Sequence, residues 1–340
     1  MSICPTSLLP VSFRILLGLY LIIPLCFILY GFDLAFLKGY LHDNLPNKPT
    51  HFLLFQILFG TPHILASNIL LFSNREYFQT YKQNILKATF IIAVVFGIGN
   101  LFIPYYAFYV AVAGWTVFHV LKQQHGVVRG ICQLPNWAYQ SLLWLSVVAG
   151  LLIYIGIFLH SRLEESLLFW LKISAGFLTT FLVLFAFYAQ RYAPTNFGKT
   201  FLWANVFLVV SSFYLFTQEY YFFAILIPRL VHDATAYIFY VTHDFNKHFA
   251  SPQNTLYRVA KRFSIPIFLV LPVLSFVLAF LLQAYGDMFI EWLTQTILGI
   301  EIHKVITLGV LGYCALMHYY CEGLTWQTGS PYRQFISFSK

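Results

Sequence analysis

Residues 141–159 read SLLWLSVVAGLLIYIGIFL, a run without a charged side chain. A helix of about 20 apolar residues is long enough to cross the hydrocarbon core of a bilayer. Backbone polar groups in hydrocarbon need partners within the chain, so only helices and closed barrels span membranes. The run lacks the alternation of a barrel strand. It therefore predicts a transmembrane α-helix.

The composition of the rest of the chain agrees with this stretch. Hydrophobic residues make up 59% of the 340 residues and charged residues only 9%, and the mean hydropathy is +0.73. Soluble domains carry about 25% charged residues, so most of this surface is predicted to face lipid. We expect an all-α polytopic membrane protein of about 10 helices (range about 8 to 10), forming one transmembrane domain over residues 1–340.

The predicted spans lie near residues 11–31, 52–72, 86–103, 105–121, 138–160, 167–189, 201–217, 220–242, 263–283 and 304–321. The longest polar stretch, residues 243–262, is predicted to be a loop. The segments that meet near residue 104 and near residues 218–219 are each either a hairpin or a broken helix.

The positive charges predict the orientation, because cytoplasmic loops retain Lys and Arg. Fourteen of the 20 Lys and Arg residues fall in the even-numbered loops and the termini, and Arg229 lies inside a span. The odd-numbered loops hold the other five, which are Lys38, Lys48, Arg162, Lys172 and Lys304. Both termini are therefore expected in the cytoplasm, in a cell inner membrane or the endoplasmic reticulum. Topology and anionic lipid account for the net charge of +8, so we expect no nucleic-acid partner.

Most of the eleven histidines gather on one side of this topology. Four fall in outward loops or at helix ends: His42, His51, His160 and His303. The others lie in TPHILASN (61–68), FHVLKQQHG (118–126), VHDATAYIFYVTHDFNKH (231–248) and MHYYCEGLTW (317–326). All four segments belong to even-numbered spans, which places these histidines in the cytoplasmic half of the membrane. Solvation in a basic loop accounts for His248.

The segment 229–248 carries the densest set of ionisable residues, which inside spans are costly and usually functional. Arg229 and Asp233 are four residues apart, so they can pair on a helix. His232 and His243 are eleven residues apart and point in similar directions, but a helix separates them by about 16 Å. They cannot share one metal ion on a straight helix. The adjacent stripe of candidate catalytic residues consists of Asp233, Tyr237, Tyr240 and Asp244.

The remaining candidate metal ligands are identified from their immediate sequence neighbours. His318 and Glu322 are four residues apart, so both can reach one ion from one helical face. The polar residues before Gly126 suggest that the helix ends there, which would let the chain after it fold back. His63 follows Pro62, where a kink would open the backbone. The predicted metal ligands are His63, His119, His125, His232, His243, His318 and Glu322.

The predicted metal centre combines ligands that lie at equal depth in the membrane. His243 would bind metal with His318 and with His119 or His125, near the cytoplasmic ends of their helices. His232 lies about three turns deeper. It would form a second metal layer with His63, or line a substrate channel with Asp233 and Arg229.

Several imidazoles with one or two carboxylates suit iron best, as one or two non-haem ions, with zinc or copper as alternatives. In this respect the chain resembles, at the level of general design, the histidine-rich non-haem iron enzymes of membranes: acyl desaturases and hydroxylases, sterol oxidases and carotene dioxygenases. The His-x-x-x-His and His-x-x-His-His boxes of the desaturases do not occur here, so no residue is carried over by position.

This resemblance implies a metal-dependent oxidoreductase, an oxygenase or desaturase acting on a hydrophobic lipid or isoprenoid substrate. It further implies an electron-donor protein on the cytoplasmic side. Two alternatives remain open at this point. One is a proton- or metal-coupled transporter, and the other is a haem protein with paired axial histidines.

Overall fold

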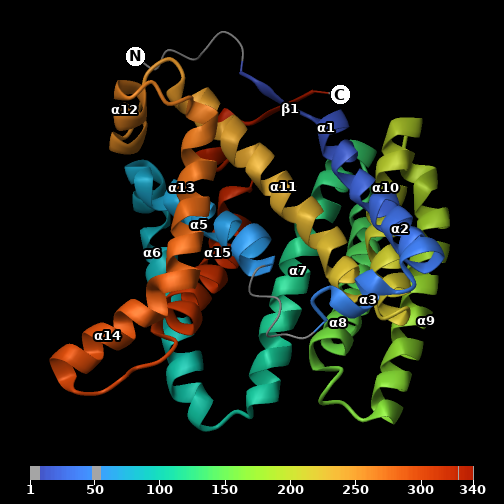
Figure 1. The fold of residues 1–340 in the computed structure, drawn as a ribbon. Helices are drawn as coiled ribbons and strands as arrows, with labels where there is room; N and C mark the ends of the chain where they lie inside the picture. Colours follow the sequence, from blue (N-terminus) through green and yellow to red (C-terminus); the bar gives the residue numbers. More distant parts are fainter. Residues whose placement is uncertain (1–7, 48–54, 328, 340) are drawn as a thin grey trace. The chain divides into compact units, whose positions relative to one another are not determined.

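The computed structural model describes residues 8–47, 55–327 and 329–339, and this part of the chain is almost entirely helical (Figure 1). Cys4, Lys48, His51 and Lys340 lie outside the described residues. The all-α class predicted from the sequence is confirmed. The chain divides into two compact units, unit 1 (residues 1–13, 54–103 and 235–340) and unit 2 (residues 14–53 and 104–234).

The helices of unit 1 come from residues 54–103 and 235–340. Its longer elements are the π-helical turn η4 (Gln56–Gly60), α5 (Thr61–Ser73), α6 (Arg75–Ile92), α12 (Thr255–Arg262), α13 (Ile267–Leu281), α14 (Asp287–Leu298), η9 (Val305–Val310) and α15 (Leu311–Thr325). The short turns η5 (Ala93–Ile98), η6 (Gly99–Leu101), η8 (Leu282–Gly286) and η10 (Tyr332–Phe335) connect or extend them. Helix α5 packs against α13 and α15, and α15 also packs against α6.

Unit 1 also contains the one sheet found among the described residues. Strand β1 (Pro10–Ser12) pairs in parallel with β2 (Ser337–Ser339). The pairing ties the two ends of the described chain together, and Asn246 reinforces it by hydrogen bonds with Leu9 and with the carbonyl of Phe335.

Unit 2 is a bundle of long helices. Its elements are α1 (Phe13–Gly18), η1 (Leu19–Leu21), α2 (Ile22–Phe32), η2 (Asp33–Leu37), α3 (Tyr40–Asn44), α7 (Tyr105–Cys132), α8 (Asn136–Leu159), α9 (Glu165–Ala189), η7 (Gln190–Tyr192) and α10 (Asn196–Thr217). Helix α11 (Tyr221–His248) contributes residues up to Ala234 to unit 2 and residues from Thr235 to unit 1.

Small residues allow the helices of unit 2 to approach closely, as is common in membrane bundles. A Cβ atom at Gly176 of α9 would lie 2.9 Å from Cζ of Phe213 in α10. A Cβ atom at Gly156 of α8 would lie 2.9 Å from Cε2 of Phe216. Aromatic rings of α10 therefore fill the space that the two glycines leave.

Among the described residues, seven helical segments are long and apolar enough to cross a membrane: Phe13–Leu37, Gln56–Ser73, Asn136–Leu159, Glu165–Tyr192, Asn196–Thr217, Tyr221–His248 and Ile267–Leu298. The three other predicted spans, 86–103, 105–121 and 304–321, are also helical but do not belong to this set. Exposed apolar side chains on the candidate spans, such as Trp170 and Leu184 of α9, fit a surface that faces lipid. These features indicate a membrane protein.

Two local expectations are wrong. Helix α7 does not end at Gly126 but continues to Cys132, where Gln133 takes a left-handed conformation with φ of 52°. A glycine inside a helix costs only about 1 kcal/mol, which packing can outweigh. The segment 243–262 is not a loop throughout, because α11 continues to His248 and Asn254 caps α12 by accepting a hydrogen bond from the amide of Tyr257.

At the junctions near residue 104 and near residues 218–219, the chain forms two separate helices. Pro104 precedes α7 at its N-cap, and a left-handed Glu219, with φ of 63°, separates α10 from α11.

Candidate metal centre

His63 lies in the first turn of α5, directly after the π-helical turn η4. Pro62 occupies the same first turn, at the junction between the π-helical turn and the α-helix. Single π-helical turns often mark functional sites, and here the turn precedes a histidine that is fully buried.

His318 of α15 lies against His63 in unit 1. Their ring centroids are 4.4 Å apart and the rings meet edge to face at 89°. Nδ1 of His318 lies 2.5 Å from Oγ of Ser67, and the Ser67 hydroxyl donates to the carbonyl of Ile64. Because the single hydroxyl proton is used there, Ser67 accepts from Nδ1–H of His318. In this tautomer Nε2 is the ring nitrogen of His318 that carries the lone pair.

Glu322 follows His318 by one turn, as the sequence predicted. Its Oε2 lies 3.9 Å from Nε2 of His318. Its Oε1 accepts a 2.5 Å hydrogen bond from the hydroxyl of Tyr240. Tyr240 thereby holds the carboxylate of Glu322 beside the imidazole.

Unit 2 contains a second pair of histidines. The rings of His119 in α7 and His232 in α11 have centroids 4.9 Å apart and meet edge to face at 83°. One turn before His232, Nε of Arg229 lies 3.2 Å from Oδ2 of Asp233, which confirms the predicted ion pair. Oδ1 of Asp233 is 4.0 Å from Nε2 of His232.

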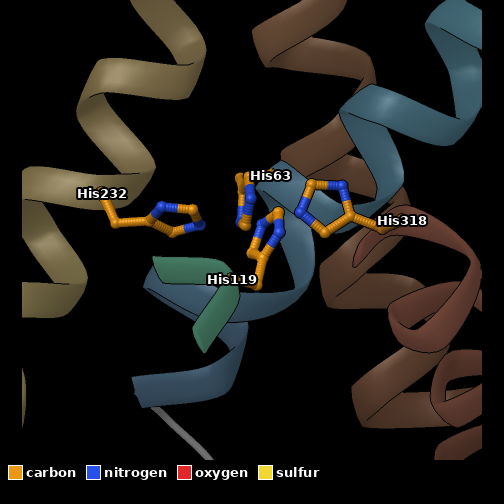
Figure 2. A group of neighbouring side chains, drawn as sticks. All are labelled: His63, His119, His232 and His318. Atoms are coloured by element: carbon orange, nitrogen blue, oxygen red, sulfur yellow. The ribbon is translucent and has the colours of Figure 1, made fainter. Parts of the chain in front are cut away.

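Each of these two histidine pairs offers ring nitrogens that could hold a metal ion. His63 and His318 form the pair of unit 1, His119 and His232 form the pair of unit 2, and the four are named the histidine group. All four side chains are buried, and Figure 2 shows the helix that carries each of them. Neutral imidazole is a ligand that suits zinc, copper, iron and nickel. The donor set therefore fits a transition-metal ion.

His125 lies six residues after His119 on the same continuous helix and does not belong to this group. Its Nδ1 accepts from the amide of Asn205 at 3.0 Å, and its Nε2 lies 3.0 Å from Oγ of Ser146. Both ring nitrogens have protein partners, so His125 joins α7 to α8 and α10.

His243 is also absent from the group and has its own partners in unit 1. Its Nδ1 lies 2.9 Å from Oδ1 of Asp244, and its Nε2 lies 2.6 Å from the hydroxyl of Tyr77. Asp244 also accepts a hydrogen bond from Tyr257. Burial, followed by the negative charge of Asp244, raises the pKa of Tyr257. Burial likewise raises the pKa of Tyr77, so both phenols remain protonated donors.

The predicted catalytic stripe on α11 does not converge on one point. Asp233 pairs with Arg229, and Asp244 bonds its neighbour His243. The hydroxyl of Tyr237 lies 2.7 Å from Oγ of Ser275, and Tyr240 donates to Glu322. Of the four residues, Tyr240 is joined to a member of the histidine group through Glu322, and Asp233 lies next to His232.

Sequence reasoning missed the residues that orient these histidines. Ser67 follows His63 by four residues, a spacing that places both on one helical face and could have indicated it. Tyr77 and Tyr257 lie in polar segments near the helix starts, where no local pattern distinguishes a buried tyrosine from an exposed one.

Comparison with known proteins adds no assignment, because no family model, curated protein or solved structure matches the chain.

Proposed function

We propose that this protein is a membrane-embedded metalloprotein, and that its metal ligands come from the pair His63 and His318 of unit 1 and the pair His119 and His232 of unit 2. The observation that carries the proposal is the contact of two buried histidine rings in each unit, with ring centroids 4.4 Å apart in unit 1 and 4.9 Å apart in unit 2. Scattered histidines of a helical core have no reason to meet in pairs, whereas a cation accepts a lone pair from each ring.

The proposed activity is that of a non-haem iron oxidoreductase, an oxygenase or desaturase. Neutral imidazole ligands leave the charge of an ion uncompensated, and the Glu322 carboxylate beside His318 is an anion that would balance it in part. Iron bound there would supply redox chemistry. The chain itself would orient the ligands, as Ser67 does for His318, and would exclude water by burying them.

The proposed substrate is a hydrophobic molecule, a lipid or an isoprenoid, that enters from the bilayer. The seven apolar candidate spans support this, because a site among such helices is reached through hydrocarbon more readily than through water. We further propose that a cytoplasmic protein donates electrons to the site. The protein would lie in a cell inner membrane or in the endoplasmic reticulum.

The first test is the metal content and visible spectrum of the purified protein. We expect bound iron without the Soret band of haem. His63→Ala, His119→Ala, His232→Ala and His318→Ala should each lose most of the metal, since each removes a proposed ligand.

The matched controls are His125→Ala and His243→Ala, which remove equally buried histidines with protein partners. Both should keep their metal. Full metal retention in His232→Ala, or equal loss in all six variants of a folded protein, would contradict the proposed ligand set. A haem spectrum would support the alternative of paired axial histidines, and absence of any metal would leave the transporter as the better hypothesis.

A further inference from the structure

Unit 1 contains an open pocket of about 670 Å³ whose walls come from residues 73–79 and 247–258. The first wall is the start of α6, and the second runs from the end of α11 into α12. Nδ2 of Asn254 lies 3.5 Å from Oγ of Ser73 and 3.5 Å from Oδ1 of Asn74. These contacts join the two walls, and nearly all side chains that line the pocket are polar.

Three basic residues and one acidic residue line this pocket. Nζ of Lys247 pairs with Oε1 of Glu76. Within the described part of the chain, Arg75 and Arg258 form no ion pair with an acidic side chain. Nε of Arg258 donates to the carbonyl of Asn254 at 3.4 Å. Since Glu76 offsets the charge of Lys247, the charges of the two guanidinium groups remain uncompensated.

Backbone N–H groups add to the positive potential of the pocket. Helices α6 and α12 both begin at its wall, and the first two residues of each helix line it: Arg75, Glu76, Thr255 and Leu256. The first N–H groups of a helix have no acceptor within it, and the helix dipole favours an anion there. The side chain of Asn74 does not cap α6. The pocket therefore combines guanidinium groups with backbone donors, a combination that suits phosphate.

The pocket lies where candidate membrane spans end. The span Gln56–Ser73 ends at Ser73, which lines the pocket, and the span Tyr221–His248 ends one residue after Lys247, which also lines it. The headgroups of a bilayer lie at the same level, just outside the hydrocarbon core. The charge bias predicts a cytoplasmic position for this segment, and the cytoplasmic leaflet is the one that carries anionic lipid.

We propose that this pocket binds a phosphate group, and that Arg75 and Arg258 hold its oxygens. Each guanidinium group can donate two parallel hydrogen bonds to phosphate oxygens. The position at the ends of two spans favours the headgroup of an anionic phospholipid as the source of the phosphate, and inorganic phosphate is the other source of the same chemistry. The site goes beyond the proposed function and requires no metal.

The test is lipid binding to the purified protein in detergent, measured by native mass spectrometry. Dioleoyl phosphatidic acid should bind about tenfold more tightly than dioleoyl phosphatidylcholine, which corresponds to about 1.4 kcal/mol. The reason is that the arginines repel the ammonium group of choline. Inorganic phosphate should displace phosphatidic acid poorly, because it lacks the acyl chains that hold the lipid in the micelle. Equally strong binding of inorganic phosphate would assign the site to free phosphate.

Arg75→Gln and Arg258→Gln should each lower the affinity for phosphatidic acid about tenfold, since each removes a charged donor. The matched control is Arg262→Gln, because Arg262 is exposed on α12 and does not line the pocket. This control should keep the wild-type affinity. Without lipid, all three variants should melt at the wild-type temperature, because the substitutions are at exposed positions.

Two results would overturn the proposal. An equal loss of affinity in Arg262→Gln would show that the lipid is attracted by positive charge in general and not by the pocket. Unchanged affinity in both Arg75→Gln and Arg258→Gln would show that no phosphate binds there.

Discussion

At the scale of single residues, hydrogen-bond partners separate the histidines that share similar sequence surroundings. His125 and His243 each have protein partners on both ring nitrogens. For His318, Ser67 accepts from Nδ1–H, so Nε2 is the ring nitrogen that carries the lone pair. The tautomer of each ring therefore bears on whether it can act as a ligand.

Ser67→Ala tests this role for His318. The variant loses the acceptor of Nδ1–H, so His318 is less well oriented and metal affinity should fall by about 10- to 100-fold. Metal titration of the metal-stripped protein measures the change, and Ser67→Thr should restore most of the affinity.

Ser275→Ala is the matched control for Ser67→Ala. Ser275 is buried in the same unit, and its hydroxyl contacts Tyr237 and the carbonyl of Pro272. The affinity of the Ser275→Ala variant for metal should stay at the wild-type value. An equal fall in both serine variants would show that Ser67 has no special role.

At the scale of elements, the continuity of α7 and α11 determines which residues can meet. On α7, six residues separate His119 from His125, which turns their side chains to different faces. On α11, the unbroken helix from Tyr221 to His248 keeps His232 and His243 about 16 Å apart along the axis. The sequence predicted this separation but favoured His243 as the partner of His318. In the structure the ring of His318 instead contacts that of His63.

Gly126→Ala tests whether α7 is continuous. Gly126 is exposed and has no atom within 4 Å of a Cβ built on it. Alanine in a helix interior is more stable than glycine by about 0.5 to 1 kcal/mol. The melting temperature in detergent should therefore rise slightly, with the metal content unchanged.

Gly176→Ala is the control, since its Cβ would meet Phe213 at 2.9 Å. It should lower the melting temperature. If Gly126→Ala were the more destabilising of the two, a break in α7 at this glycine would be indicated.

At the scale of the whole molecule, membrane topology remains a prediction from charge. The bias of Lys and Arg toward the even-numbered loops places both termini and the segment after Lys247 in the cytoplasm. Seven segments meet the length and apolarity of a span, and the predicted total is about ten.

Reporter fusions after Lys247 and at Lys340 should both give a cytoplasmic signal. A fusion after Arg162, in a predicted outward loop, is the control and should give an external signal. An external signal after Lys247 would remove the argument that the histidine segments share one leaflet.

The sequence by itself determined the all-α class, the positions of the helical segments and the set from which the four grouped histidines come. Apolar runs and ionisable residues within them are local features, and the bilayer imposes the same requirements on each segment independently. The pairing of Arg229 with Asp233 is local for the same reason, because helical geometry alone brings residues four apart together.

Only the tertiary structure decided which histidines meet. His63 and His318 are far apart in the chain and touch because α5 packs against α15. The partners of His125 and His243 come from other helices, as Asn205 and Tyr77 show. Packing between helices determines such contacts, and helical periodicity does not encode which neighbouring helix a face will meet. The sequence could therefore name the candidate ligands, but it could not show which of them meet another histidine and which contact other side chains.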